Sequence, residues 1–236
     1  MKKFFLFDID GTLIDSNGFH ARAWEEALRI FDKSISPAAI RRQMGKGADN
    51  FLPEFLTAAE INSFGKELTE VRDSIFKYRY LPEIKPFLKV RELFKQLRKN
   101  HVRIALASSS GREEVKKYET IARVEDLVDV CTSADDAPSS KPDPDIFYAA
   151  RRKLRNPPKE SVLIVGDSPF DAAAATKAGI EVIGVLCGGF SERSLRTNGC
   201  RAVYADPADM VKKLGKILQA GGSSNQGSAS GRSIVY

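Results

Sequence analysis

Two aspartates follow a short apolar run near the start of the chain. The run Phe4–Phe7 leads directly into Asp8, and Asp10 comes two residues later, just before Gly11. A carboxylate buried behind a strand costs several kcal/mol unless a partner offsets its charge. The pair therefore predicts a site in which one carboxylate attacks an electrophile and the other transfers a proton.

Three further polar clusters follow segments that have the composition of strands. They are Ser108–Gly111 after the run 102–107, Lys141–Asp145 after the run 128–132, and Gly166–Asp171 after the run 162–165. In a parallel α/β sheet, ligands bind at the carboxyl ends of the strands, where loops lead into helices. We therefore expect the four clusters to meet at one edge of a sheet.

Each of these three clusters also has a plain explanation as the start of a helix. The explanations are a serine cap at Ser109 or Ser110, an N-cap and first-turn pair at Asp143 and Pro144, and a capping box at Ser168 and Asp171. Capping does not require two acids directly behind an apolar strand. Asp8 and Asp10 therefore carry the most weight.

Together the four clusters match one chemical task, the transfer of a phosphoryl group. Clustered carboxylates are oxygen ligands of the kind that Mg²⁺ prefers. A phosphate beside bare carboxylates would cost about 4 kcal/mol per charge pair at roughly 4 Å, whereas Mg²⁺ and Lys141 turn that repulsion into attraction. Serine hydroxyl and amide groups at a helix start would hold the phosphate. Asp8 would attack phosphorus to give an aspartyl-phosphate, and Asp10 would protonate the leaving alcohol and then activate water.

The order of strand-like and helical segments predicts an α/β fold with a parallel sheet. Strand-like runs recur at 4–7, 102–107, 128–132, 162–165, 182–186 and 202–204, and several are apolar throughout, as strands covered on both faces are. From residue 16 to residue 84 we find only helical periodicity, including an apolar stripe at Phe64, Leu68, Val71, Ile75 and Tyr78. We expect a discontinuous core of residues 1–15 and 85–220, a helical cap of residues 16–84, and a flexible Gly/Ser-rich tail of residues 221–236.

The composition argues against several other classes of protein. The chain of 236 residues has a formal net charge of +6 and a pI of about 9.2, but its basic residues are dispersed and form no nucleic-acid patch. No segment has the roughly 18 consecutive apolar residues of a membrane span, and Asp8 and Asp10 interrupt the apolar N-terminus too early for a secretory signal. The three cysteines lie far apart, which predicts neither disulfides nor a zinc site. We expect a cytoplasmic protein that binds neither nucleic acid nor membrane.

The four clusters, in this order, resemble the signature motifs of the haloacid dehalogenase (HAD) superfamily of phosphatases, and the resemblance covers roughly residues 4–218. It implies a Rossmann-like core in which Asp8 is the nucleophile and Asp10 the acid and base. It also implies that Ser108 and Lys141, together with Ser109 and Thr12, bind the phosphate. Asp8, Asp167 and the backbone carbonyl of Asp10 would hold Mg²⁺. Asp171 would orient Lys141 or metal-bound water.

The helical segment between the first and second motifs is similar to the cap of the phosphoglycolate phosphatase and β-phosphoglucomutase branch. Caps of this class close over the site, exclude water and recognise the leaving group. The candidates for that recognition are His20, Arg42 and Lys46, and Lys46 belongs to the loop MGKGAD that we expect above the phosphate site. Arg42 and Lys46 could equally be solvated side chains, and His20 could be a hinge or first-turn residue.

The resemblance implies a Mg²⁺-dependent phosphatase that hydrolyses a small-metabolite phosphate monoester, of the phosphoglycolate or sugar phosphate type, through an aspartyl-phosphate. The main alternative is a sugar-phosphate mutase, and Thr12 favours the phosphatase because mutase-like members commonly carry valine there. A dehalogenase is disfavoured because those members lack the second acid, which is Asp10 here. A phosphoacceptor signalling module is a further alternative, but such modules are shorter, about 120 residues, and lack a helical insert. We expect a monomer or weak homodimer.

Overall fold

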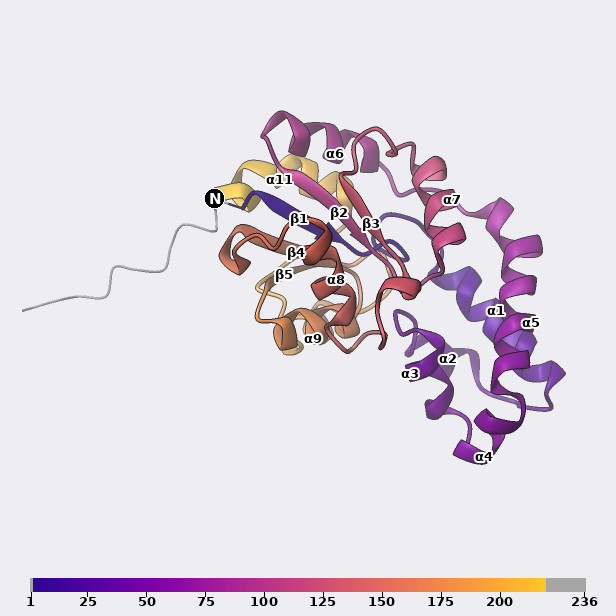
Figure 1. Cartoon of the computed structure of the whole chain (residues 1–236). Coiled ribbons are helices and arrows are strands. Elements are labelled where there is room, and N and C mark those ends of the chain that lie inside the picture. The colour runs from indigo at the N-terminus through magenta and orange to yellow at the C-terminus, as the bar shows by residue number, and fades with distance from the viewer. Residues whose placement is uncertain (1, 220–236) are drawn as a thin grey trace, which may run out of the picture.

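Six parallel strands form the centre of the molecule. The computed structural model describes residues 2–219, in which the sheet order is β3-β2-β1-β4-β5-β6 (Figure 1). The strands are β1 Phe4–Phe7, β2 Arg103–Ala107, β3 Val130–Thr132, β4 Val162–Gly166, β5 Glu181–Val185 and β6 Ala202–Tyr204. In the middle of the sheet, Phe5 of β1 lies opposite Ile104 of β2 and Leu163 of β4. The predicted parallel α/β sheet is confirmed, and each strand end lies within two residues of the predicted one.

Helices cover both faces of this sheet. The helices α6 Val90–Lys99, α7 Arg112–Ala122 and α11 Pro207–Gln219 pack on one face, and α8 Asp145–Lys153, α9 Pro169–Ala178 and α10 Glu192–Thr197 pack on the other. Successive side chains of a strand point to opposite faces. Accordingly Phe5 and Phe7 join the first hydrophobic core, and Leu6 joins the second. Burial on both faces explains why β1 is apolar along its length.

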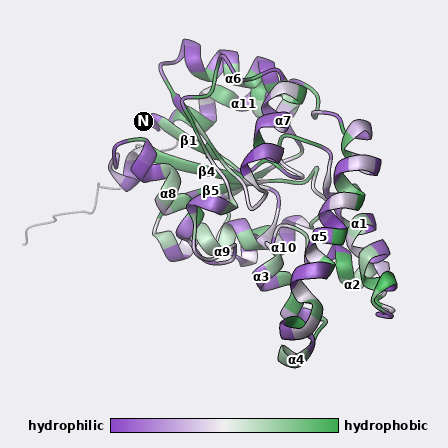
Figure 2. Cartoon of the chain, turned by 45° about the vertical axis from the view of Figure 1, so that its right-hand side comes forward, coloured by the Kyte–Doolittle hydropathy of each residue, from purple (hydrophilic) through white to green (hydrophobic). Residues whose placement is uncertain are grey.

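The chain between β1 and α6 forms a helical insert near the carboxyl ends of the strands (Figure 1). Its elements are α1 Asn17–Ile30, α2 Pro37–Arg41, α3 Ala48–Phe51, η1 Leu52–Glu54, α4 Ala58–Glu60, η2 Ile61–Gly65, α5 Lys66–Ile75, η3 Phe76–Tyr80 and η4 Leu81–Glu83. The insert has its own hydrophobic core, in which the rings of Trp24 and Phe51 stack with centroids 4.2 Å apart. Figure 2 shows hydrophobic and hydrophilic residues alternating along these helices, as in amphipathic helices. These elements are helical, as the periodicity predicted, and the boundaries between core and cap remain predictions.

The apolar stripe predicted for the insert is interrupted near its end. Leu68 is fully buried as expected, but Tyr78 is 75 % exposed. At Phe76 the helix α5 gives way to the π-helical segment η3, whose wider turn shifts the face that points inward. Phe76 and Tyr80 are therefore buried, and the prediction for Tyr78 was wrong.

The helix starts of the core confirm one predicted cap and correct two. At the start of α9, Ser168 Oγ accepts a hydrogen bond from the Asp171 amide at 3.1 Å, and Asp171 Oδ2 accepts one from the Ser168 amide at 3.1 Å, as in the predicted capping box. The serine cap expected before α7 is wrong, because Gly111 is the N-cap residue. The cap expected at Asp143 is also wrong, because Pro144 is the N-cap residue of α8.

Two further expectations concern membrane-spanning helices and the C-terminal tail. Within residues 2–219, no helix combines the length and hydrophobicity that crossing a membrane requires. The predicted flexible tail at residues 221–236 lies outside the described residues. The other short helical turns in the described part of the core are the 3₁₀ segments η5 Ala134–Asp136 and η6 Lys159–Ser161.

The packing of α6 against the sheet can be tested at Phe94. This side chain is fully buried, and its ring centroid lies 4.9 Å from that of Phe7. Because Phe94→Ala would leave a cavity between helix and strand, we expect it to lower the free energy of unfolding by about 3–5 kcal/mol, measured by urea denaturation. Tyr78→Ala, at an exposed aromatic residue, is the control and should change that free energy by less than about 0.5 kcal/mol. Equal losses in the two variants would contradict this packing.

Candidate active site

The predicted clusters meet at the carboxyl ends of the central strands. Asp8 directly follows β1, and Asp167 directly follows β4. Lys141 comes from the loop between β3 and α8, and its Nζ forms ion pairs with Asp8 and, at 2.7 Å, with Asp171 Oδ1. Residues separated by more than 100 positions are therefore brought into direct contact, as the parallel sheet predicted.

Lys141 is buried without exposure to solvent. Its ammonium group donates hydrogen bonds to Asp8 and, at 3.2 Å, to the backbone carbonyl of Ala107. Burial by itself would lower the pKa of Lys141, but the carboxylates of Asp171 and Asp8 outweigh it and raise that pKa above its ordinary value. The lysine therefore remains positively charged in the interior.

The carboxylates around Lys141 outnumber it. Asp8, Asp167 and Asp171 are all buried, and each offers an oxygen within 4.8 Å of the others. Burial, together with Asp8 and Asp171, raises the pKa of Asp167 well above its ordinary value. Burial and Asp171 likewise raise the pKa of Asp8 to about 7, even though Lys141 acts in the opposite direction.

This charge balance fits a divalent cation. Three carboxylates and one ammonium group leave two negative charges in a buried cluster. Oxygen donors of this type are the ligands that Mg²⁺ takes. Burial and, after it, the neighbouring carboxylates raise the pKa values of Asp8 and Asp167, and a bound cation would act against both causes. The residues present therefore fit a bound magnesium ion.

Neighbouring polar groups hold Asp167 in place from the other side. Asn17, at the start of α1, donates from Nδ2 to Asp167 Oδ2 at 2.8 Å and to the carbonyl of Gly188 at 3.0 Å. A Cβ atom at Gly188 would lie 1.7 Å from Asp167 Oδ2, so only glycine leaves room for the carboxylate. The hydroxyl of Thr12 lies 3.0 Å from Asp8 Oδ2 and 3.2 Å from Asp167 Oδ1. Thr12 thus contacts carboxylates, whereas the sequence suggested a contact to phosphate.

A cavity of about 570 Å³ lies between the carboxyl ends of the strands and the helical insert, and Asp8, Asp10, Ser108 and Ser109 are among its lining residues. Ser108 is fully buried, and its Oγ accepts a hydrogen bond from the Ser110 amide at 3.0 Å. Ser109 Oγ is buried and has no hydrogen-bond partner among residues 2–219. An unpaired buried hydroxyl is costly, so this group is available to a polar ligand in the cavity.

Asp10 lies in a network of hydrogen bonds beside the same cavity. Its Oδ1 accepts from Ser16 Oγ at 2.5 Å and lies 2.9 Å from His20 Nε2, and its Oδ2 lies 3.2 Å from Ser110 Oγ. Burial works to raise the pKa of Asp10, but His20 and the hydrogen bonds from Ser16 and Tyr118 outweigh it and lower that pKa well below its ordinary value. The network therefore favours the ionised carboxylate.

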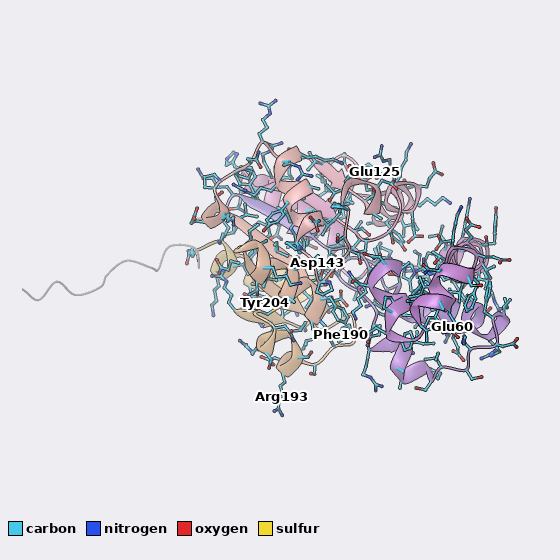
Figure 3. All side chains as sticks on the ribbon, turned by 60° about the horizontal axis from the view of Figure 1, so that its bottom comes forward. Glu60, Glu125, Asp143, Phe190, Arg193 and Tyr204 are labelled. Carbon is cyan, nitrogen blue, oxygen red and sulfur yellow. The ribbon has the colours of Figure 1, made fainter. Side chains whose placement is uncertain are left out.

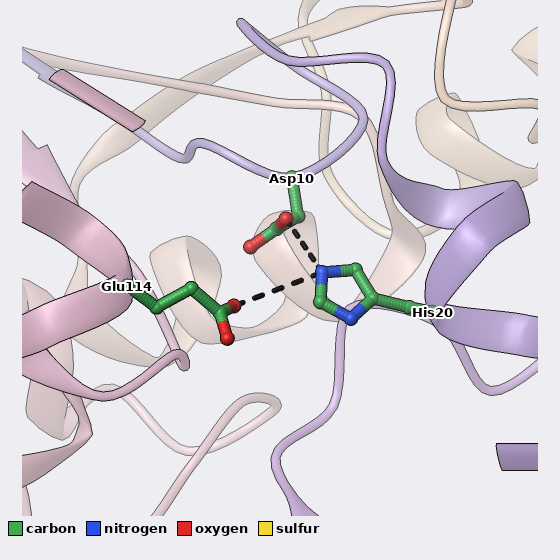
Figure 4. A group of neighbouring side chains, drawn as sticks. All are labelled: Asp10, His20 and Glu114. Carbon is green, nitrogen blue, oxygen red and sulfur yellow. Dashed lines mark hydrogen bonds and ion pairs between the residues drawn. The ribbon is translucent and has the colours of Figure 1, made fainter. Parts of the chain in front are cut away.

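His20 is a buried member of this network, and the geometry indicates which ring nitrogen carries the proton. Figure 4 shows the ring between Asp10 and Glu114, with Nε2 turned toward both. On the opposite side, Nδ1 lies 2.6 Å from a guanidinium nitrogen of Arg72. Because a guanidinium group only donates, Nδ1 must accept, and Nε2 therefore carries the hydrogen that reaches Asp10. The ring also stacks on Phe76 with centroids 3.9 Å apart.

The other two residues proposed from the insert lie differently. Lys46 lines the cavity, but its Nζ bonds Glu54 Oε1 at 2.6 Å and lies 4.8 Å from the ring centroid of Phe170. Phe170 in turn makes an edge contact with Phe190, which lies on the side of the core nearest the insert (Figure 3). Arg42 is exposed and is not among the residues that line the cavity. The structure thus brings Lys46, but not Arg42, to the site.

The loop that contains Lys46 also holds the insert against the core. The amide of Gly47 donates to Ser140 Oγ at 3.0 Å, and Asn50 Nδ2 donates to the Ser140 carbonyl at 3.0 Å. The amide of Ser140 donates to Asp49 Oδ2 at 2.9 Å. Ser140 directly precedes Lys141, so this contact links the insert to the centre of the site. Sequence reasoning missed it, since no motif pairs segments about 90 positions apart.

Comparison with known proteins identifies the family to which this fold and site belong. A family model described as haloacid dehalogenase-like hydrolase matches residues 5–185. The chain therefore belongs to this family of hydrolases, and the resemblance inferred from the four motifs is confirmed.

Individual relatives extend over nearly the whole chain. A phosphorylated carbohydrates phosphatase from Thermotoga maritima is 27% identical over 218 residues, which cover 90% of this chain and 98% of the relative. A phosphoglycolate phosphatase from Yersinia pestis is 29% identical over 214 residues, which cover 89% and 91%. The crystal structure of a hydrolase from Pseudomonas syringae matches with a TM-score of 0.82 at 28% identity and covers 92% of this chain and 99% of that one. The predicted Rossmann-like fold is thereby confirmed.

The crowding of charge at Asp8 predicts a pH dependence of stability. Its folded pKa of about 7 lies above the ordinary value, so its stabilising contribution is complete at low pH and is lost as the pH rises through about 7. In chelator-treated protein, we expect Asp8 to reduce the free energy of unfolding by roughly 2 kcal/mol between pH 5 and pH 7. Asp8→Asn should remove that part of the slope, measured by urea denaturation at several pH values.

The control for this measurement is Asp15→Asn, which removes an exposed carboxyl close to Asp8 in sequence. Its unfolding free energy should follow that of the wild type across the pH series. If Asp8→Asn also follows the wild type, the buried carboxylates do not repel one another as described.

Proposed function

We propose that this hydrolase is a Mg²⁺-dependent phosphatase, which cleaves phosphate monoesters of small metabolites through an aspartyl-phosphate on Asp8. The observation that carries the proposal is the buried cluster of Asp8, Lys141, Asp167 and Asp171 beside the cavity that Ser109 lines. The relatives named as phosphatases of phosphorylated carbohydrates and of phosphoglycolate support it.

The cavity offers groups that suit a phosphate at its inner end. Ser109 Oγ has no partner within the described residues, and Ser108 lies next to it on the loop after β2. Lys141 brings a permanent positive charge that already touches Asp8. A phosphate bound by these groups would lie against the carboxylate of Asp8, which then attacks phosphorus and displaces the alcohol.

Asp10 is suited to move protons to and from the reacting oxygens. To protonate the leaving alcohol, Asp10 must first gain a proton, and a phosphate dianion bound nearby raises its pKa in the required direction. Once the alcohol has left, the contacts with His20 and Ser16 favour the ionised carboxylate again. In that state it can take a proton from the water that hydrolyses the aspartyl-phosphate.

The residues that would hold Mg²⁺ are Asp8, Asp167 and, by resemblance to the family, the backbone carbonyl of Asp10. When bound, the ion would balance the buried carboxylates and the phosphate charge. Asp171 forms an ion pair with Lys141 and caps α9, so its part is to keep the lysine and the helix in position.

The nucleophile can be tested by Asp8→Asn, which keeps the size of the side chain but removes its charge. We expect phosphate release to fall by at least about 10³-fold while the circular dichroism spectrum is unchanged. Asp143→Asn, at an exposed ion pair with Lys177, is the control and should keep wild-type rates. Near wild-type turnover in Asp8→Asn would exclude Asp8 as the nucleophile.

The metal requirement is tested by removal and replacement. Chelation should abolish phosphate release, and added Mg²⁺ should restore it. Ca²⁺ should not restore it, because Ca²⁺ takes more ligands at longer and looser distances. Equal rates with both ions would contradict this mechanism.

Continued release of phosphate over many turnovers also separates a hydrolase from the two alternatives. A mutase returns the phosphoryl group to sugar, and a phosphoacceptor module stops after one equivalent.

A further inference from the structure

Glu114 of α7 lies on the wall of the cavity, and the proposed phosphatase mechanism gives it no part. Its Oε1 accepts hydrogen bonds from Ser110 Oγ at 2.6 Å and from Tyr118 Oη at 2.8 Å. Its Oε2 makes no hydrogen bond to any residue between 2 and 219. The side chain is 20% exposed, and so the carboxylate is held firmly by one oxygen while the other remains able to bind a ligand.

This carboxylate is a close neighbour of the proposed proton donor. Ser110 Oγ lies 2.6 Å from Glu114 Oε1 and 3.2 Å from Asp10 Oδ2, so one hydroxyl joins the two acids. From the other side, His20 Nε2 lies 2.9 Å from Asp10 Oδ1 and 3.9 Å from Glu114 Oε1 (Figure 4). Glu114 and Asp10 therefore line the same part of the cavity, beside the position of the alcohol that Asp10 would protonate.

We propose that Glu114 is a specificity-determining residue, which selects neutral polyhydroxylated leaving groups, such as those of sugar or polyol phosphates, over leaving groups that carry a second anion. This inference rests on the proposed phosphatase function. A hydroxyl on the carbon atoms next to the ester would donate to Glu114 Oε2, and a hydrogen bond to a charged acceptor is among the stronger ones. A carboxylate at the same position, as in glycolate, would meet a like charge.

Among the described residues, none of the lysines and arginines that line the cavity forms an ion pair with Glu114. Arg72 is turned to Asp73, at 2.7 Å, and to the ring of His20. Lys46 forms an ion pair with Glu54 at 2.6 Å. Lys77 and Lys117 also line the cavity and have no carboxylate within 4 Å in the described chain. Lys77 is an exposed side chain, and neither lysine forms an ion pair with Asp10 among residues 2–219. Binding of an anion by these lysines is therefore tested separately.

The test compares two kinds of ester in wild type and in Glu114→Gln. The esters are glycerol 3-phosphate and glucose 6-phosphate, with neutral leaving groups, and phosphoglycolate, with an anionic one; p-nitrophenyl phosphate reports general activity. We expect the wild type to prefer the neutral esters by roughly tenfold or more in kcat/KM. Glu114→Gln should lower kcat/KM for them and raise it for phosphoglycolate, so that the ratio falls by roughly tenfold or more.

The control is Glu125→Gln, which removes the same charge from an exposed position just beyond α7 that does not line the cavity. It should leave the ratio unchanged. A wild-type preference for phosphoglycolate, an equal effect of Glu114→Gln on all esters, or the same shift in Glu125→Gln would each overturn the inference. A loss of phosphoglycolate hydrolysis in Lys77→Met or Lys117→Met, with Glu114→Gln unchanged, would overturn it in favour of anion binding by the lysines.

The phosphatase activity and the role of Glu114 can be tested separately. If the wild type with Mg²⁺ releases no phosphate even from p-nitrophenyl phosphate, the proposed function is wrong and the inference falls with it. If p-nitrophenyl phosphate is hydrolysed and the ratio behaves otherwise than expected, only the role of Glu114 is wrong.

Discussion

The excess of negative charge around Lys141 is the constraint on which the site depends. One fully buried ammonium group contacts two carboxylates, and a third lies within reach of both. Removing charges from water is costly, and their mutual attraction compensates only when the geometry is good. Here the compensation is incomplete, since the pKa values of Asp8 and Asp167 are raised. A site with unbalanced negative charge is prepared for a cation.

The parallel sheet creates this crowding and at the same time supports it. Because β1 and β4 are hydrogen-bonded neighbours with Phe7 opposite Val165, the residues that follow the two strands, Asp8 and Asp167, are brought close together. The hydrophobic cores on both faces make the strands rigid, so the carboxylates cannot move apart to relieve their repulsion. The capping box at Ser168 holds Asp171 in the same way, through the start of α9.

The two ends of the cavity have different origins. The inner end, with Asp8 and Ser109, is built from strand ends of the core, and it suits a phosphate whatever the alcohol. The outer end is built jointly by the insert and α7, where Arg72, His20 and Glu114 come together around Asp10. In the proposed function, the groups that act on the phosphate and the groups beside the leaving alcohol therefore belong to different elements. The contacts of Ser140 with the insert loop keep the two ends in a fixed relation.

Short-range signals in the sequence were enough to predict the strands, the helical character of the insert and the inner end of the site. Apolar runs followed by polar clusters identify strand ends, and a parallel sheet brings strand ends together, so the proximity of Asp8, Lys141 and Asp167 followed from the sequence alone. The tertiary structure decided which other side chains reach them. Asn17, Arg72 and Glu114 belong to no local motif, because their partners lie 50 to 150 positions away or on another element. Arg42, the residue that ends α2, is exposed and does not line the cavity. Tyr78 points to solvent because the π-helical turn changes the phase of the helix, and only the packed fold sets that phase.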